Sequence, residues 1–222
     1  VDCGATAIDV MDFADQKGMK AIIIDHHKVD KPLPKCIAHI NPSREEDSSL
    51  LNDLAAVGLT FIFIVALRRA IRNLNLFPDI NEPGLKQYLD LVALGTVCDG
   101  VQLKGLNRAF VKQGLAIMAK RKNPGLRALC DVCKLNSPPS TYDLGFLLGP
   151  RINAGGRIGN SKLGIELLTA KTSVEAEEFA NKLDELNIDR RKIEAKALQE
   201  AEDQIAERNS ESGLLWVAKE GW

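Results

Sequence analysis

The chain has 222 residues, a formal net charge of −1, 45% hydrophobic residues and 27% charged residues. These values indicate a soluble globular protein with one large or two small domains. The sequence contains no run of about 18 apolar residues, so a membrane-spanning helix is not expected. Five cysteines, an odd number, fit a reducing compartment better than a disulfide framework. No export signal is visible, and we expect a cytoplasmic protein.

Charged residues are unevenly distributed along the chain. Residues 104–162 contain eleven basic and two acidic residues, whereas residues 173–212 contain twelve acidic and six basic residues. A basic middle segment beside an acidic tail fits a surface that binds phosphates on an otherwise neutral protein. Charge alone leaves open the alternative that these are ordinary solvated helix faces.

The first part of the chain alternates helical and strand patterns. Residues 5–17 carry apolar side chains at helical spacing, and Gly18 is a typical C-terminal cap. Residues 19–24 form a short apolar run rich in isoleucine, which favours a buried strand. This alternation predicts an α/β fold with a parallel sheet, flanking helices, and ligands beyond the carboxyl ends of the strands.

The chain after the polar connection 31–53 is predicted to be mostly helical. Helices are expected over residues 56–73, 85–97, 107–120, 125–134 and 162–170. The last element, about 173–209, has a narrow apolar stripe and begins with Thr172 and Glu175 spaced as a capping box. It would extend on the order of 50 Å, as a helix that bridges domains or pairs with another helix. Residues 214–217 then resemble the start of a strand.

The Asp25-His26-His27 triplet directly follows the predicted strand 19–24, so its side chains should lie at the strand's exit. Imidazole and carboxylate together suit Mn²⁺, Zn²⁺ or Fe better than Mg²⁺, which prefers oxygen ligands. The alternative is a polar turn with a surface histidine pair. Because two of the three histidines fall in this triplet, we interpret it as the centre of a metal site.

Asp2 and Asp99 are further candidate ligands. Asp2 stands at the end of a short strand pattern before Gly4, although taken alone it would more often be a helix N-cap. Asp99 follows an amphipathic helix and precedes a glycine, which also fits a turn residue. Carboxylates from separated chain positions are the usual way to hold two metals about 3.5–4 Å apart, and this favours the functional interpretation.

Residues 149–159 combine four glycines with two arginines and an asparagine. Glycine lets backbone N–H groups approach an anion, and the arginine and asparagine side chains can donate to phosphate oxygens. The candidate phosphate-binding residues are Arg151, Asn153, Gly155, Gly156 and Arg157. The segment lacks the Lys-Ser/Thr ending of a nucleotide-binding P-loop, so no nucleoside triphosphate site is predicted. The alternative is a flexible surface loop.

Two other features are interpreted as structural. Cys130 and Cys133 have the spacing of a zinc half-site but no second pair within finger spacing, and they fall in a predicted helix, so buried thiols are expected. His39 is expected to be a packed or surface histidine rather than a ligand.

Four motifs occur in a characteristic order and spacing. They are Val-Asp-Cys-Gly at 1–4, Asp-His-His at 25–27, Leu-Gly-Thr-Val-x-Asp at 94–99 and Gly-Pro-Arg-Ile-Asn-Ala-Gly-Gly-Arg at 149–157. Together they resemble RecJ-like exonucleases of the DHH phosphoesterase superfamily over essentially the whole chain. Asp-His-His alone would indicate only the superfamily, which includes pyrophosphatases, oligonucleotide-degrading enzymes and cyclic-dinucleotide phosphodiesterases.

The resemblance implies a metal-dependent 5′-to-3′ exonuclease that hydrolyses single-stranded DNA in recombination and repair. Asp2 would bridge two divalent metals, Mn²⁺ or Mg²⁺, while His26 and Asp99 would complete the shell of one. His27 would contact the scissile phosphate, and Asp25 would orient a neighbouring ligand. The DNA backbone would be held by Arg151, Asn153, Gly155, Gly156 and Arg157. The partners implied are single-stranded DNA, single-strand-binding protein and a RecQ-type helicase.

The same resemblance divides the chain. Residues 1–171 would be the DHH core, with an α/β part at 1–55 and a mainly helical part at 56–171. Residues 172–211 would be the interdomain connecting helix, and residues 212–222 would begin a missing DHHA1 domain. RecJ-like proteins also carry an earlier Asp-x-Asp motif, so we expect a fragment that binds one metal or none and hydrolyses DNA poorly.

Two alternatives remain open at this point. A DHH-family phosphodiesterase acting on short oligonucleotides or cyclic dinucleotides would not need the long basic segment 104–162. A non-catalytic DNA-binding scaffold would be expected to have lost metal ligands, whereas Asp2, His26, His27 and Asp99 are all present.

Overall fold

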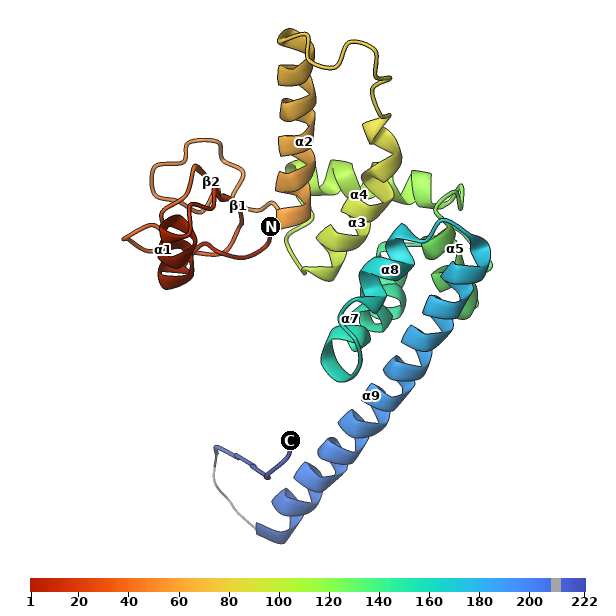
Figure 1. Cartoon of the computed structure of the whole chain (residues 1–222). Helices are drawn as coiled ribbons and strands as arrows, with labels where there is room; N and C mark the ends of the chain where they lie inside the picture. Colours follow the sequence, from red (N-terminus) through yellow and green to blue (C-terminus); the bar gives the residue numbers. More distant parts are fainter. Residues whose placement is uncertain (209–212) are drawn as a thin grey trace. The chain divides into compact units, whose positions relative to one another are not determined.

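A computed structural model describes residues 1–208 and 213–222 of the chain. The chain divides into two compact units, one of Val1–Lys122 with Ser137–Gly145 and one of Asn123–Asn136 with Phe146–Trp222. Helices predominate in both units, and the first also contains a small parallel sheet (Figure 1). The predicted helix-rich α/β fold is confirmed. The functional boundaries expected from the sequence remain a prediction.

The small sheet follows helix α1 (Ile8–Gln16) in the first unit. Strand β1 (Ile22–Ile24) pairs in parallel with strand β2 (Ala38–Ile40). Isoleucine is β-branched and packs well on a pleated surface, and two of the three side chains of β1 are buried. The parallel pairing agrees with the sequence prediction, although β1 is shorter than the expected strand at 19–24.

Helix α2 (Ala56–Asn73) packs beside β1, and Figure 1 shows it next to the small sheet of the same unit. Buried Ile24, Leu54 and Leu59 form a hydrophobic cluster that joins the sheet to the start of α2. Partly buried neighbours complete the cluster: Ile40, Leu51, Ile62, Phe63 and Phe110. This apolar contact fixes β1, and therefore the residues that follow it, against α2.

The end of helix α3 carries the predicted ligand Asp99. A 3-10 turn (Leu85–Tyr88) leads into α3 (Leu89–Cys98), against which helix α4 (Gly105–Met118) packs. A Cβ atom at Gly114 of α4 would lie 2.1 Å from a backbone carbonyl oxygen of α3, so only glycine allows the two helices to approach this closely. This packing holds the exit of α3 in place. The short helix α6 (Thr141–Asp143) also belongs to the first unit.

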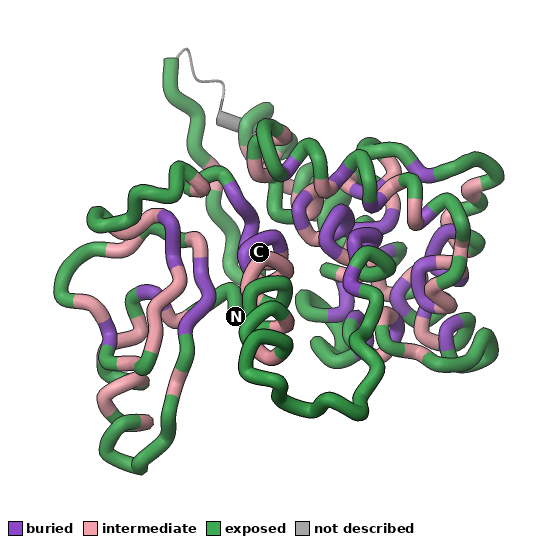
Figure 2. Tube along the Cα trace, turned by 90° about the horizontal axis from the view of Figure 1, so that it is seen from above, coloured by how far each residue is buried: buried purple, intermediate pink, exposed green. Residues whose placement is uncertain are grey.

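The second unit is built around one long helix. Three shorter helices pack against α9 (Ser173–Arg208): α5 (Pro124–Val132), α7 (Gly149–Ile158) and α8 (Leu163–Thr169). Ala176, Ala180 and Leu183 of α9 are fully buried. Figure 2 shows buried positions along the helices, whereas the connecting segments are mostly exposed.

Most predicted helices agree with the structure to within two or three residues. The helix expected at 85–97 begins as the 3-10 turn described above. The predicted capping box is present, since Glu175 N donates to Thr172 Oγ1 and Thr172 N donates to Glu175 Oε2, each at 3.2 Å. The predicted helix end at Asn209 lies outside the described residues. Residues 214–217 form no strand in the described part of the chain.

The alternative considered for residues 149–159, a flexible surface loop, is wrong, because most of the segment forms helix α7 (Gly149–Ile158), preceded by a π-helical turn at Leu144–Leu148. Pro150 lies in the first turn of α7, where proline is tolerated because no intrahelical donor is lost. Ala154 and Gly155 are buried. Packing of this face therefore outweighs the low helix propensity of glycine.

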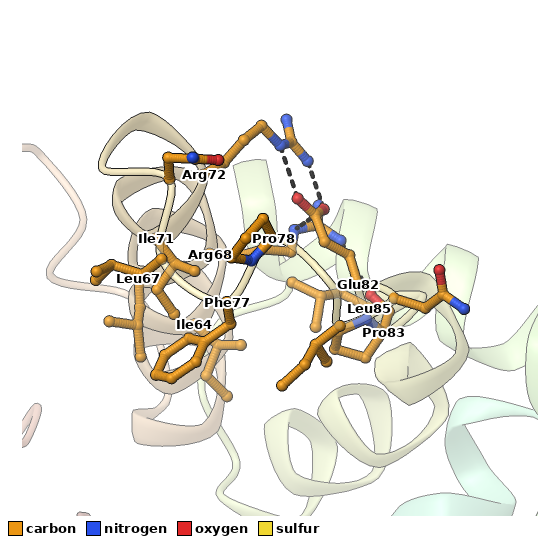
Figure 3. Close-up of a pocket in the computed structure, with 14 residues that line it drawn as sticks. Ile64, Leu67, Arg68, Ile71, Arg72, Phe77, Pro78, Glu82, Pro83 and Leu85 are labelled. Atoms are coloured by element: carbon orange, nitrogen blue, oxygen red, sulfur yellow. Dashed lines mark hydrogen bonds and ion pairs between the residues drawn. The ribbon is translucent and has the colours of Figure 1, made fainter.

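A pocket of about 490 Å³ lies between α2 and the segment that connects it to α3 (Figure 3). Its walls are largely apolar, with Leu67 and Phe77 among them. At the rim of the pocket, Arg72 Nε donates to Glu82 Oε1 at 2.8 Å. In this ion pair the Arg72 guanidinium and the Glu82 carboxylate neutralise each other. None of the residues predicted to bind metal or phosphate lines this pocket. Separately, within residues 1–208 and 213–222 no helix combines the length and the apolar character needed to cross a bilayer.

The contact between α5 and α8 can be tested at Gly125. A Cβ atom there would lie 1.9 Å from the carbonyl oxygen of Leu167. We expect Gly125→Ala to lower the free energy of unfolding by about 1–3 kcal/mol, because the two helices must separate. In the control, Gly156→Ala, the added Cβ meets no atom within 4 Å, so stability should stay unchanged or rise slightly. Urea titrations followed by circular dichroism measure the stability of both variants. If Gly125→Ala were as stable as the parent, the close contact between α5 and α8 would be contradicted.

Candidate metal centre

Asp25 is the buried centre of the Asp-His-His segment, with only 1% of its surface exposed. Its Oδ2 accepts a hydrogen bond from Ala5 N at 2.9 Å. Its Oδ1 accepts from His26 N at 2.8 Å and from His27 Nδ1 at 2.7 Å, with His27 N farther away at 3.3 Å. The carboxylate therefore ties the turn after Asp2 to the residues that follow β1.

These hydrogen bonds keep Asp25 ionised. Burial acts to raise the pKa of Asp25, but the hydrogen bonds from the His27 side chain and from three backbone N–H groups outweigh it and lower the pKa to about 2. A buried carboxylate that accepts several hydrogen bonds is stable as the charged form. Asp25 is thus saturated by the chain itself, which fits an orienting group better than a direct metal ligand.

His26 directs an unpartnered nitrogen toward two carboxylates. Its Nε2 lies 3.5 Å from Asp2 Oδ1 and 3.5 Å from Asp99 Oδ2. This nitrogen is buried and has no hydrogen-bond partner among the described residues. Two ligands that each lie about 2.1 Å from a shared cation are about 3.0–3.5 Å apart. Each carboxylate therefore lies at a distance from His26 Nε2 that a shared divalent cation would require.

The two carboxylates come from separate parts of the first unit. Asp2 has φ 60°, and its N–H donates to Ile24 O at 2.8 Å, so the first residues run beside the end of β1. Asp99 is the C-cap of α3. Their side chains are 60% and 31% exposed, so both can reach a solvent-borne ligand. The structure brings together Asp2, His26 and Asp99 as expected, and their role as ligands remains a prediction.

His27 presents its ring to solvent. Its side chain is 61% exposed, and Nδ1 lies 2.7 Å from Asp25 Oδ1. The hydrogen bond with Asp25 raises the pKa of His27 above its ordinary value and outweighs burial, which acts to lower it. One ligand atom from each of Asp2, His26 and His27 lies within 4.8 Å of the others. His27 is therefore placed either to contact a cation or to donate a hydrogen bond to an anion beside it.

The neighbouring thiol of Cys98 does not compete for this role. Burial raises the pKa of Cys98 to about 11, and the adjacent Asp99 adds to this effect. Its Sγ lies 3.7 Å from Leu144 O. Since only the thiolate is a good metal ligand, Cys98 is neutral and structural at physiological pH.

Sequence reasoning missed two polar residues beside the histidines. Asn41 Nδ2 donates to His27 O at 2.9 Å, and Ser43 Oγ donates to His26 O at 2.8 Å. Both follow β2 directly, and the signal that could have found them is the polar Asn-Pro-Ser stretch after an apolar strand. His39, in β2, has both ring nitrogens buried without a partner among the described residues, and burial lowers its pKa. This agrees with a packed histidine.

The candidate phosphate-binding residues belong to the second unit, and the structure divides them by environment. Arg151 is mostly buried, and its Nε donates to Asp184 Oδ1 at 2.8 Å while its Nη1 donates to Leu147 O at 2.8 Å. The guanidinium is thus occupied within the protein. Gly155 is buried, and a Cβ there would lie 3.0 Å from Leu183 Cδ2. It serves close helix packing.

The backbone anion cradle predicted for Gly155 and Gly156 is corrected by this geometry. Both residues lie inside α7, where backbone N–H groups donate within the helix. Asn153 and Arg157 are exposed on the same helix, and Arg157 forms no ion pair within the described residues. These two side chains are available to a ligand. Cys130 is buried in α5, as predicted for a structural thiol.

The fold agrees with comparisons to known proteins. Residues 1–96 match the model of the DHH family, N-terminal domain. Residues 1–96 thus resemble the N-terminal domain of DHH-family proteins. Relatives of the chain include the single-stranded-DNA-specific exonuclease RecJ of Haemophilus influenzae, 40% identical over 88% of this chain and 34% of the relative. The enzyme of the same name from Dickeya dadantii is 41% identical over the same shares. The matched part of the chain thus spans about a third of the length of these relatives.

Solved structures give the same result. The crystal structure of exonuclease RecJ bound to manganese matches with a TM-score of 0.79 and 29% identity, over 92% of this chain and 49% of that chain. RecJ from Thermus thermophilus in complex with Mn²⁺ matches with a TM-score of 0.76 and 30% identity, over 90% of this chain and 29% of that chain. The resemblance predicted from the four sequence motifs is confirmed.

The hydrogen bonds of Asp25 predict a pH dependence of stability. Because its pKa is lowered on folding, ionised Asp25 stabilises the fold above about pH 4, and this contribution is lost as the pH falls toward 2. The shift corresponds to about 2 kcal/mol. We expect Asp25→Asn to lose at least this much at pH 7 and to depend less on pH between 5 and 2 than the parent. Urea unfolding across this range provides the measurement.

The exposed Asp15 provides a control, since Asp15→Asn removes a carboxylate that makes no hydrogen bond with the described residues. This variant should retain the stability and the acid sensitivity of the parent. An Asp25→Asn variant that unfolds in parallel with the parent at every pH would show that the buried carboxylate contributes nothing.

Proposed function

We propose that this chain is the core of a metal-dependent exonuclease that hydrolyses single-stranded DNA, acting in the 5′-to-3′ direction in recombination and repair. The observation that carries the proposal is the buried, unpartnered Nε2 of His26, 3.5 Å from both Asp2 and Asp99. The 40% identity to an enzyme named as a single-stranded-DNA-specific exonuclease supports the choice of substrate.

The cation proposed is Mn²⁺ or Mg²⁺, held by Asp2, His26 and Asp99. RecJ structures bound to manganese support this choice, and imidazole nitrogen favours Mn²⁺ over Mg²⁺. When bound, the cation would supply positive charge that activates water and stabilises the charge developing on the phosphate. Asp2, His26 and Asp99 would form one such site, so we expect this chain to bind one divalent ion.

His27 and Asp25 would act together on the phosphate. The exposed imidazole of His27 is fixed through its Nδ1, which leaves the opposite side of the ring free to donate to a phosphate oxygen. Its raised pKa favours the protonated ring that such a donor needs. Asp25 would hold the ring in this orientation and would not exchange protons with the substrate, because its pKa is far below neutrality.

The DNA backbone would be contacted by Asn153 and Arg157, the exposed members of the predicted set. Their positions one turn apart on α7 suit neighbouring phosphate oxygens. Arg151 would support them indirectly by fastening α7 to α9 through Asp184. Single-strand-binding protein and a RecQ-type helicase are proposed as further partners on the basis of the family resemblance.

Metal binding is the first test. We expect the chain to bind one Mn²⁺ by isothermal titration calorimetry and His26→Ala to weaken binding by about 100-fold, because a direct ligand is lost. His39→Ala is the matched control, since it removes a packed histidine of the same unit and should leave the Mn²⁺ affinity unchanged. Equal affinity of His26→Ala and the parent would refute the site. Degradation of labelled single-stranded DNA by the full-length protein, compared with degradation of a dinucleotide, then tests the substrate.

The two arginines of α7 should respond differently. Arg157→Ala is expected to weaken single-stranded DNA binding by about tenfold without loss of stability, since one phosphate contact is removed. Arg151→Ala should lower the free energy of unfolding by about 1–3 kcal/mol, because it leaves Asp184 without its ion pair. Fluorescence anisotropy and urea unfolding measure the two effects. Loss of stability in Arg157→Ala with unchanged DNA affinity would overturn the assignment.

A further inference from the structure

The two histidines of the metal site lie just beyond the hydrogen-bonded part of the sheet. Strand β1 ends at Ile24, and the last ladder bond runs from Asp25 N to Ile40 O at 3.0 Å. The carbonyl groups of His26 and His27 therefore need hydrogen-bond donors from outside the sheet. Side chains from the exit of β2 supply both of them.

Asn41 and Ser43 form a clamp on these carbonyls. Ser43 Oγ donates to His26 O at 2.8 Å, and Asn41 Nδ2 donates to His27 O at 2.9 Å. Asn41 Oδ1 also accepts from Ser43 N at 2.8 Å, so the two clamp residues brace each other. Asn41 is only 3% exposed, and the amide is thus held in one orientation.

The side-chain contacts of the two histidines differ, and the difference makes the hydrogen bond from Ser43 important for the position of His26. The ring of His27 is anchored by Asp25. The ring of His26 forms no hydrogen bond with the described residues, and its Nε2 is buried. Apart from an edge-to-face contact with the His27 ring, at 4.6 Å between ring centroids, the placement of that ring depends on the His26 backbone, whose N–H donates to Asp25 and whose carbonyl accepts from Ser43.

We propose that Ser43, braced by Asn41, is a positioning residue that aims His26 Nε2 between Asp2 and Asp99. The inference rests on the proposed metal site and assigns it a further structural determinant. Rotation of the peptide after His26 would swing the imidazole, and a ligand displaced by about 1 Å no longer matches the narrow range of metal–nitrogen distances. Losing an outer contact of this kind typically costs about 10–100-fold in metal affinity.

The test compares serine variants in one loop. Ser43→Ala removes the donor to His26, whereas Ser43→Thr keeps a hydroxyl. Ser49→Ala is the matched control, since the Ser49 hydroxyl bonds Asp47 in the same connection and does not contact the histidines. Manganese affinity is measured by electron paramagnetic resonance. We expect about 10-fold or greater weakening for Ser43→Ala, with Ser43→Thr and Ser49→Ala within about threefold of the parent.

A second readout needs no metal. In the ¹⁵N-labelled chain without manganese, the ring signals of His26 should shift in Ser43→Ala and stay in place in Ser49→Ala. Unchanged His26 signals and parental affinity in Ser43→Ala would overturn the clamp, as would equal weakening in Ser49→Ala or no rescue by threonine. If the parent itself fails to bind Mn²⁺ while the His26 signals still shift in Ser43→Ala, the proposed metal site fails and the positioning contact stands.

Discussion

The arrangement of the candidate site depends on one buried charge, the carboxylate of Asp25. Each of its oxygens bonds a different stretch of chain, Oδ2 the turn at Ala5 and Oδ1 the two histidines. Burying a carboxylate is costly unless hydrogen bonds compensate. The chain meets this requirement by wrapping its first residues and the exit of β1 around the same group. The turn after Asp2 and the His26 backbone thus share one anchor.

Hydrophobic packing in the first unit holds the segments around Asp25 in place. The cluster of Ile24, Leu54 and Leu59 sets the end of β1 against α2, and Gly114 permits the close contact that sets the end of α3. Three chain segments consequently end near one another with polar residues at their termini. Apolar packing determines where the segments end, and the charged and polar side chains at those ends determine which ligand they could bind.

Sequence reasoning pointed to the candidate ligands because the Asp25-His26-His27 triplet directly follows an apolar, isoleucine-rich strand. It could not foresee the clamp, since Asn41 and Ser43 act through contacts with backbone carbonyls across the sheet, and such contacts leave no periodic pattern. It misjudged residues 149–159 because four glycines suggest a loop, whereas the burial of Gly155 against Leu183 selects a helix. In both cases the structure depends on contacts between residues that are distant in the sequence.

The hydrogen bonds around Asp25 and the clamp on the histidine carbonyls use only groups of the chain, so they do not require a bound ion. Ligand arrangements that exist in advance avoid most of the entropy loss that accompanies ordering on binding. Capture of the cation should therefore be governed by removal of its hydration shell and not by folding of the protein around it. Because Mg²⁺ releases water reluctantly, such a rigid, histidine-containing site would discriminate between cations through the rate at which they enter.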